Sequence, residues 1–98
     1  MMMLRSADLA VTRLYAVEVS GWDSKDHFFV ERCKLEWDEE SSKQVALTRA
    51  LGKNTLLLVR LLEEAESDRS HAVVYEAEFV GKTKRGRQQF RLNAVVPS

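Results

Sequence analysis

This chain contains a single cysteine, a single proline and no excess of charge of either sign. Because Cys33 has no partner, an internal disulfide is excluded, and a reducing cytoplasm is the expected location. The 15 Lys and Arg residues balance the 15 Asp and Glu residues, so no global field attracts the protein to nucleic acid or to an anionic membrane. Any electrostatic partner must therefore bind to a local patch.

Long hydrophobic runs are also missing. The longest apolar cluster covers residues 56–62 and is interrupted by Arg60, which is far short of the roughly 20 residues that a membrane-spanning helix needs. The N-terminal sequence MMMLRSAD introduces charge before an apolar region develops, so no signal peptide is expected. The sequence predicts a soluble cytoplasmic protein without membrane contact.

Residues that carry catalysis or bind metals do not occur at diagnostic spacings. His27 and His71 each begin an expected strand, but no set of His and Cys residues has the spacing of a zinc site. The carboxylates at residues 38–40 are adjacent in a polar loop, where hydration is expected rather than acid or base catalysis. Cys33 is interpreted as a buried strand thiol. The prediction is a protein that is not an enzyme and requires neither cofactor nor metal.

Short alternating segments separated by turn-like stretches recur along the 98 residues, a length that suits one domain. They predict strands, because β-branched and aromatic residues alternate with polar ones and the intervening stretches have turn composition. We expect residues 1–11 to be a flexible lead-in and residues 12–98 to form a single β-barrel domain. The five clearest strands are expected at residues 12–20, 27–37, 55–62, 71–80 and 87–96, with Pro97 ending the last.

Residues 43–51 allow two interpretations. In the first, Ser42 caps a short helix that ends before Gly52. In the second, the same stretch begins with a strand that turns Val45 and Leu47 inward. The strand is favoured because the flanking elements are strands that need a partner. The fold class is then all-β, a small six-stranded antiparallel barrel.

The remaining hydrophobic residues are assigned mainly to packing. Residues 55–62 are apolar on both faces, which favours a strand that lies in the core or closes the barrel. Most aromatic residues alternate with polar ones and are expected to be buried. Trp22, in a turn, and Phe28, on a mixed strand face, are the two candidates for exposed contacts.

The last third of the chain carries the only concentrated charge of one sign. The turn GKTKRG at residues 81–86 is expected to join two long strands, and a glycine-flanked tip with arginines suits phosphate groups, whose oxygens match guanidinium donors. The alternative is a solvated tip whose charges prevent association of sheet edges. Five cations fall within ten residues there with no acid among them: Lys82, Lys84, Arg85, Arg87 and Arg91.

Three stretches carry a resemblance to a known family: FFVERCKL at residues 28–35, LGKNTLLLVRL at residues 51–61, and the closing hairpin at residues 71–80 and 87–92. Through them, roughly residues 13–96 resemble the PilZ domain, a six-stranded barrel of bacterial regulators that bind cyclic di-GMP. It implies a PilZ-like barrel in bacterial signalling.

The nucleotide-binding motifs of that family do not carry over. The family has two arginines four residues apart ahead of its first strand, whereas this chain has Arg13 with Leu9 at the partner position and Arg5 at a spacing of eight. The family also has Asp or Asn, then Ser, then Gly near the end of its second strand, where this chain reads KLEWDE at residues 34–39. Acids at this place would repel the phosphates of the nucleotide. The resemblance therefore implies a module that is degenerate for cyclic di-GMP.

Two functional hypotheses follow. The first is a non-catalytic signalling adaptor that contacts a protein partner, with cyclic di-GMP binding left open although its motifs are absent. The second is a small nucleic-acid-binding barrel that uses the basic hairpin at residues 82–91. The oligomeric state is not fixed by the sequence. The candidate anion- or partner-binding residues are Lys82, Lys84, Arg85, Arg87, Arg13 and Trp22.

Overall fold

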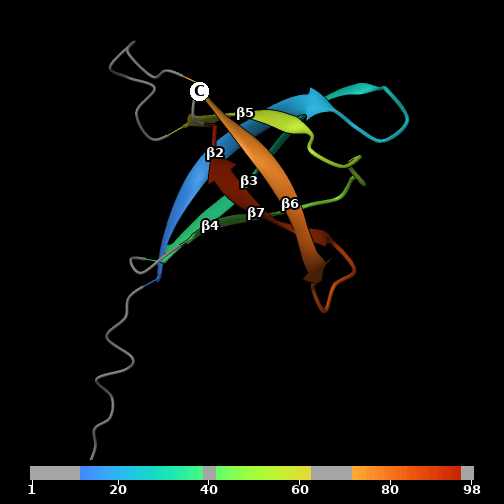
Figure 1. Cartoon of the computed structure of the whole chain (residues 1–98). Helices are drawn as coiled ribbons and strands as arrows, with labels where there is room; N and C mark the ends of the chain where they lie inside the picture. Colours follow the sequence, from blue (N-terminus) through green and yellow to red (C-terminus); the bar gives the residue numbers. More distant parts are fainter. Residues whose placement is uncertain (1–11, 39–41, 63–71, 96–98) are drawn as a thin grey trace, which may run out of the picture.

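A computed structural model describes residues 12–38, 42–62 and 72–95, which form a closed antiparallel β-barrel of six strands (Figure 1). The expected all-β barrel is confirmed. The expected lead-in at residues 1–11, and His71 and Pro97, lie outside the described residues. The strands are β2 (Thr12–Trp22), β3 (Phe28–Asp38), β4 (Ser42–Leu47), β5 (Leu56–Leu61), β6 (Val73–Lys82) and β7 (Gln88–Ala94).

The barrel consists of two three-stranded meanders. The order around the barrel is β2-β3-β4-β7-β6-β5, so β4 pairs with β7 and β5 closes the barrel onto β2. The turns at residues 23–27 and 83–87 and the loop at residues 48–55 all lie at one end, which we name the turn end (Figure 1). The first residues of β2 and β4 and the last residues of β3 and β7 lie at the opposite end.

The core consists of the inward-facing side chains of all six strands. Buried and more exposed side chains alternate along β2, β5 and β7, as expected for a sheet with one face packed and one face in water. In the described residues, every buried side chain of the core is apolar and no polar or charged residue is buried. The core residues are Val17, Val19, Phe29, Leu35, Val45, Leu47, Leu57, Val59, Ala77, Phe90 and Leu92.

The ambiguous stretch at residues 43–51 begins with a strand, so the favoured interpretation is confirmed and the helix is wrong. β4 pairs with β3 through Asp38 and Ser42, and with β7 through Leu47 and Gln88. Val45 and Leu47 are both buried, as the strand interpretation requires. A helix here would leave β3 and β7 without the partner that joins the two meanders.

The prediction that residues 55–62 lie in the core is only half right. Leu57 and Val59 are buried, but Leu56 and Leu58 are 53% and 42% exposed. A barrel has a single layer of strands, and β5 has no second layer over its outer face in the described residues. The alternate leucines of this strand therefore face water.

β2 continues two residues beyond its expected end, so Gly21 and Trp22 belong to the strand and not to the turn. Gly21 lies where β2 crosses β5, opposite Leu57. A Cβ atom on Gly21 would lie 2.9 Å from Leu57 Cδ2 and 3.1 Å from the carbonyl oxygen of Leu56. The close approach of two strands, rather than a turn, explains this glycine.

Candidate functional site

The basic turn, residues 83–87, is held by internal hydrogen bonds and presents its cations to solvent. The backbone N–H of Thr83 donates to the carbonyl of Arg87 at 2.8 Å, and the N–H of Gly86 donates to the carbonyl of Thr83 at 2.9 Å. Thr83 Oγ1 accepts from the N–H groups of Arg85 and Arg87. Gly86 has φ +84°, a left-handed conformation that glycine adopts without strain. The side chains of Lys82 and of the turn cations are exposed.

The charge of this hairpin is lower than the sequence predicted, because Arg91 is neutralised. Glu78 faces Arg91 across β6 and β7, and Arg91 Nη1 lies 3.2 Å from Glu78 Oε1. Hydrogen bonds from Asn93 and then Arg91 hold the pKa of Glu78 below its usual range. Within the part of the chain that the structure describes, no carboxylate pairs with the other four cations, Lys82, Lys84, Arg85 and Arg87.

The structure does not bring Arg13 and Trp22 to the basic turn. Arg13 pairs with Trp37 at the end of the barrel opposite the turns. Trp22 lies at the turn end, but on β2, which stands three strands away from β7 in either direction around the barrel. The six candidate residues are therefore distributed over three separate places.

A hollow of 240 Å³ lies beside the basic turn, lined by residues of β3, β4 and β7 that include core residue Val45. The pairing of β3 with β4 covers only Glu36 to Asp38 on β3, so the two strands separate toward the turn end. Lys34 and Arg87 line this hollow, and the acidic Glu36 does so as well. The hollow therefore places charges of both signs beside the basic turn.

A continuous exposed apolar surface lies elsewhere, on the outer face of β3, β2, β5 and β6. Val30, Ser20, Leu58 and Val74 are consecutive cross-strand neighbours and form one row over these four strands. A second row, toward the turn end, contains the pair Trp22–Phe28, whose ring centroids are 5.2 Å apart, and Leu56. We name this surface the apolar wall. Its six apolar residues are between 40% and 58% exposed: Trp22, Phe28, Val30, Leu56, Leu58 and Val74.

An ionic row borders the apolar wall on the side away from the turns. Glu18 on β2 faces Arg32 on β3 and Arg60 on β5. Arg60 Nη2 lies 2.7 Å from Glu18 Oε1, and Arg32 Nε lies 3.7 Å from Glu18 Oε2. The hydrogen bond from Arg60 is the main cause that lowers the pKa of Glu18. The apolar surface therefore stops at a line of paired charges.

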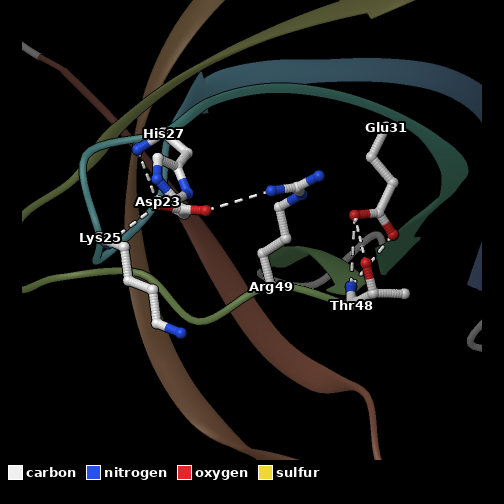
Figure 2. Close-up of polar contacts among 6 residues, drawn as sticks. All are labelled: Asp23, Lys25, His27, Glu31, Thr48 and Arg49. Carbon is white, nitrogen blue, oxygen red and sulfur yellow. Dashed lines mark hydrogen bonds and ion pairs between the residues drawn. The ribbon is translucent and has the colours of Figure 1, made fainter.

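At the other border, polar contacts fix the turn at residues 23–27 that connects Trp22 to Phe28 (Figure 2). Asp23 Oδ1 accepts from the backbone N–H groups of Lys25 and His27, both at 2.9 Å. Asp23 Oδ2 accepts from Arg49 Nη1 at 3.1 Å, which ties the turn to the loop after β4. The bond to the His27 N–H is the largest cause that lowers the pKa of Asp23.

A second contact in Figure 2 joins β3 to the same loop. The Glu31 carboxylate accepts from the backbone N–H of Thr48 at 3.0 Å and from the Thr48 hydroxyl at 2.9 Å. Between this loop and the turn lies a hollow of 310 Å³, lined by Trp22 and Leu56 together with Asp23 and Asp26. The apolar wall thus ends in a hollow whose lining includes the exposed Asp26.

Several aromatic residues differ from their expected burial. Trp22 and Phe28 are exposed, in agreement with the sequence, but Trp37 and Phe79 are 42% and 54% exposed although packing was expected. Phe79 stacks edge to face on buried Phe90, at a centroid distance of 5.8 Å. The pairing of β5 with β6 ends at Glu76, so no neighbouring strand covers Phe79 on that side.

Residues 12–38, 42–62 and 72–95 contain no group of three or more His, Cys, Asp or Glu side chains that could hold a metal ion. Burial, followed by the charge of Glu31, raises the pKa of Cys33 to about 11, which keeps this thiol protonated and poorly nucleophilic at neutral pH. No helix long and apolar enough to cross a membrane occurs in the described part of the chain.

A comparison with known protein families, with curated proteins and with solved structures finds no match for this chain. Sequence reasoning missed Leu56, Leu58 and Val74 as surface residues. The available signal was the apolar character of both faces of residues 55–62, since a strand in a single-layer barrel exposes one of its faces.

Proposed function

We propose that this chain is a non-catalytic, PilZ-like β-barrel module of bacterial signalling that binds a protein partner through the apolar wall. The observation that carries the proposal is the continuity of this surface over four strands. Its residues come from three separate parts of the sequence, and cross-strand pairing aligns them. Contiguous apolar surface of this kind on a soluble protein marks an interaction site more often than an accident of composition.

The composition of the apolar wall resembles the centre of a protein interface. Trp22 and Phe28 supply two large aromatic side chains already held in contact, and aromatic anchors of this type dominate binding energies. The paired Glu18, Arg32 and Arg60 form a polar rim on one side. Asp26 and Glu76 stand near Leu56 on the other side. The matching partner surface is apolar and carries a lysine or arginine at its border.

The proposal includes the loss of cyclic di-GMP binding. Arg13, the arginine that the resemblance places near the ligand, faces Trp37 across β2 and β3, and Leu9 stands where the resemblance expects the partner arginine. One arginine without its partner does not supply the pair of guanidinium groups that a dianionic ligand needs. Isothermal titration with cyclic di-GMP at low salt is expected to give no binding heat. Micromolar affinity would show that the barrel retains a nucleotide-binding site, and it would leave the assignment of the fold unchanged.

Site-specific photo-crosslinking tests the protein contact directly. A photoreactive amino acid replaces Leu58 in the centre of the apolar wall, and a matched variant carries it at Lys34, an exposed position on the outer face of β3. We expect position 58 to crosslink a defined protein in the native host and position 34 not to do so. Trp22→Ala should then weaken binding of that purified protein by about tenfold or more.

Two outcomes would contradict the proposal. Equal crosslinking from both positions would show that the apolar wall has no selective partner. Crosslinking of position 58 only to a second copy of the chain would replace the adaptor with a homodimer, which analytical ultracentrifugation of the unmodified protein would verify.

A second candidate function rests on the basic turn. Lys84, Arg85 and Arg87 are exposed and have no carboxylate partner in the described residues, and Arg87 lines the hollow together with Lys34 and Glu36. We infer that this surface can hold backbone phosphates of a single-stranded nucleic acid. Trp22 lies on a distant strand, so base stacking on Trp22 does not belong to this site.

Salt dependence separates this second candidate from the first. Binding of a short single-stranded oligonucleotide should weaken steeply as salt rises, because the protein displaces condensed counterions. Replacing Lys84, Arg85 and Arg87 together with Ala should abolish it, while Lys25→Ala in the other exposed turn serves as the matched control. Unchanged affinity in the triple variant would exclude the basic turn as the contact.

A further inference from the structure

Lys43 has an unusual position at the end of the barrel opposite the turns. It stands on the inward-facing row of β4, two residues before buried Val45. Its ammonium nitrogen lies 4.4 Å from the ring centroid of Trp37 and 5.6 Å from that of Tyr75. Trp37 is the direct cross-strand neighbour of Lys43 on β3, whereas Tyr75 comes from β6. Strands from both meanders therefore supply rings to one cation.

A third ring completes this cluster. Tyr15, an inward-facing residue of β2, has its ring centroid 5.9 Å from that of Trp37 at an interplanar angle of 54°. Tyr15 and Tyr75 pack against the hydrophobic core, and burial raises the pKa of Tyr75. Trp37, in contrast, is 42% exposed. The ring cluster thus has a floor on the core and one wall that solvent reaches.

The aromatic rings of Trp37 and Tyr75 are the electrostatic partners of the Lys43 ammonium group. Among the described residues, no carboxylate lies within ion-pair distance of Lys43 Nζ. The π faces of tryptophan and tyrosine attract a cation, and the attraction increases as the cation loses water. A primary ammonium is strongly hydrated and gains little from such an exchange. A methylated ammonium carries the same charge, is more weakly hydrated and fills the space between rings, which is why aromatic cages select it.

We propose that Tyr15, Trp37 and Tyr75 form a binding site for a quaternary alkylammonium ion, and that Lys43 occupies this site in the free protein and competes with the ligand. The site lies at the opposite end of the barrel from Trp22 and does not depend on the proposed function. The flexible stem of Lys43 allows its head group to leave for solvent, and the ligand must displace it to bind.

The first test compares affinities by following backbone amide signals in NMR titrations with tetramethylammonium chloride, at ionic strength held constant with sodium chloride. Lys43→Gln removes the competing charge, so this variant should bind about tenfold more tightly than the unmodified chain, as expected for loss of one partly desolvated cation–π contact. Lys25→Gln, an exposed lysine in the turn at the other end of the barrel, is the matched control and should bind like the unmodified chain. Trp37→Leu in the Lys43→Gln background should abolish saturable binding.

Several results would overturn the proposal. These are equal affinities of Lys43→Gln and Lys25→Gln, retained affinity after Trp37→Leu, or shifts that grow linearly and scatter over the barrel. Trimethyllysine and choline, titrated into Lys43→Gln, separate the two sources of a quaternary ammonium. Binding of either one supports the site and the tighter one identifies the source, whereas binding of neither overturns the proposal.

A measurement on the unmodified chain keeps the proposal falsifiable should a variant fold poorly. Ring currents of Trp37 and Tyr75 should move the proton signals of the Lys43 side chain upfield of the other lysines, and saturating tetramethylammonium should return them toward ordinary values. Lys43 signals at ordinary values in the free protein would show that the cage has no resident cation and would overturn the proposal.

Discussion

Asp23 in the β2–β3 turn and Thr83 in the β6–β7 turn hold the same position in two turns with the same hydrogen bonds. Each side chain accepts from the backbone N–H groups two and four residues later, and each backbone N–H donates to the carbonyl four residues later. A left-handed residue follows three positions after each, Asp26 in one turn and Gly86 in the other. The difference is charge, because only Asp23 can titrate.

This difference predicts a pH dependence that one turn shows and the other does not. The pKa of Asp23 in the folded chain lies below its ordinary value of 3.8, chiefly because its carboxylate accepts from the His27 N–H. A depressed pKa stabilises the folded state above the unfolded pKa, and the stabilisation disappears as pH falls through the folded pKa. Asp23→Asn should therefore lower the urea midpoint at pH 7, and the deficit should vanish toward pH 2.

Thr83→Val is the matched control for this titration. It removes the equivalent hydroxyl acceptor without changing charge, so its deficit should stay constant with pH. Glu18 and Glu78 also have lowered pKa values, but they titrate in every variant and cancel in the comparison. A pH-independent deficit for Asp23→Asn would show that the charge of Asp23 contributes nothing to the turn.

The architecture was predictable because it depends on local patterns. Alternation within each segment identifies the strands, and it also decides for a strand at β4, where Val45 and Leu47 must both face inward. The end of β2 was harder to predict from the sequence, because Gly21 and Trp22 have turn composition. The proximity of β5, which requires a glycine there, is a long-range fact that local sequence does not contain.

The candidate surfaces depend on register, which is why the sequence identified them only in part. Val30, Leu58 and Val74 become neighbours through three strand pairings, and none of these pairings follows from composition. The same is true of Glu78, whose position opposite Arg91 removes one charge from the basic hairpin. Trp22 was identifiable because a large aromatic beside a turn stands out without any knowledge of its neighbours.

The two faces of β5 should respond very differently to truncation. Leu57 is fully buried, so Leu57→Ala leaves a cavity and should cost about 2–5 kcal/mol in the free energy of unfolding. Leu58 is 42% exposed, and Leu58→Ala should change stability by no more than about 0.5 kcal/mol. Urea unfolding followed by circular dichroism measures both. A large loss for Leu58→Ala would indicate that the outer face of β5 is covered in the free protein and is not a docking surface.

A methyl group at Gly21 should be poorly tolerated. Its Cβ would meet Leu57 Cδ2 at 2.9 Å and the Leu56 carbonyl oxygen at 3.1 Å, and the second contact cannot be relieved by a rotamer change. Gly21→Ala should therefore destabilise by about 1–3 kcal/mol. Gly52→Ala is the control, because its Cβ would meet only Thr55 Oγ1 at 3.7 Å. Equal urea midpoints for the two variants would show that β2 and β5 can separate without cost.

Cys33 should react slowly with alkylating agents until the solution is strongly alkaline. Its pKa of about 11 means that little thiolate is present at pH 8. An unfolded cysteine, with a pKa of about 8.5, is substantially ionised at the same pH. We expect the iodoacetamide rate in the folded protein to keep rising beyond pH 9, and the rate in urea to level off near pH 9 to 10.

Arg87 acts against the two main causes and lowers this pKa, so Arg87→Ala should slow alkylation further, while Lys84→Ala in the same turn should not. Because the folded pKa is raised, the protonated thiol stabilises the fold fully below the unfolded pKa, and this stabilisation should fade as pH rises toward 11. Fast alkylation at pH 7 would instead identify a reactive thiolate and would reopen the question of chemistry at this position.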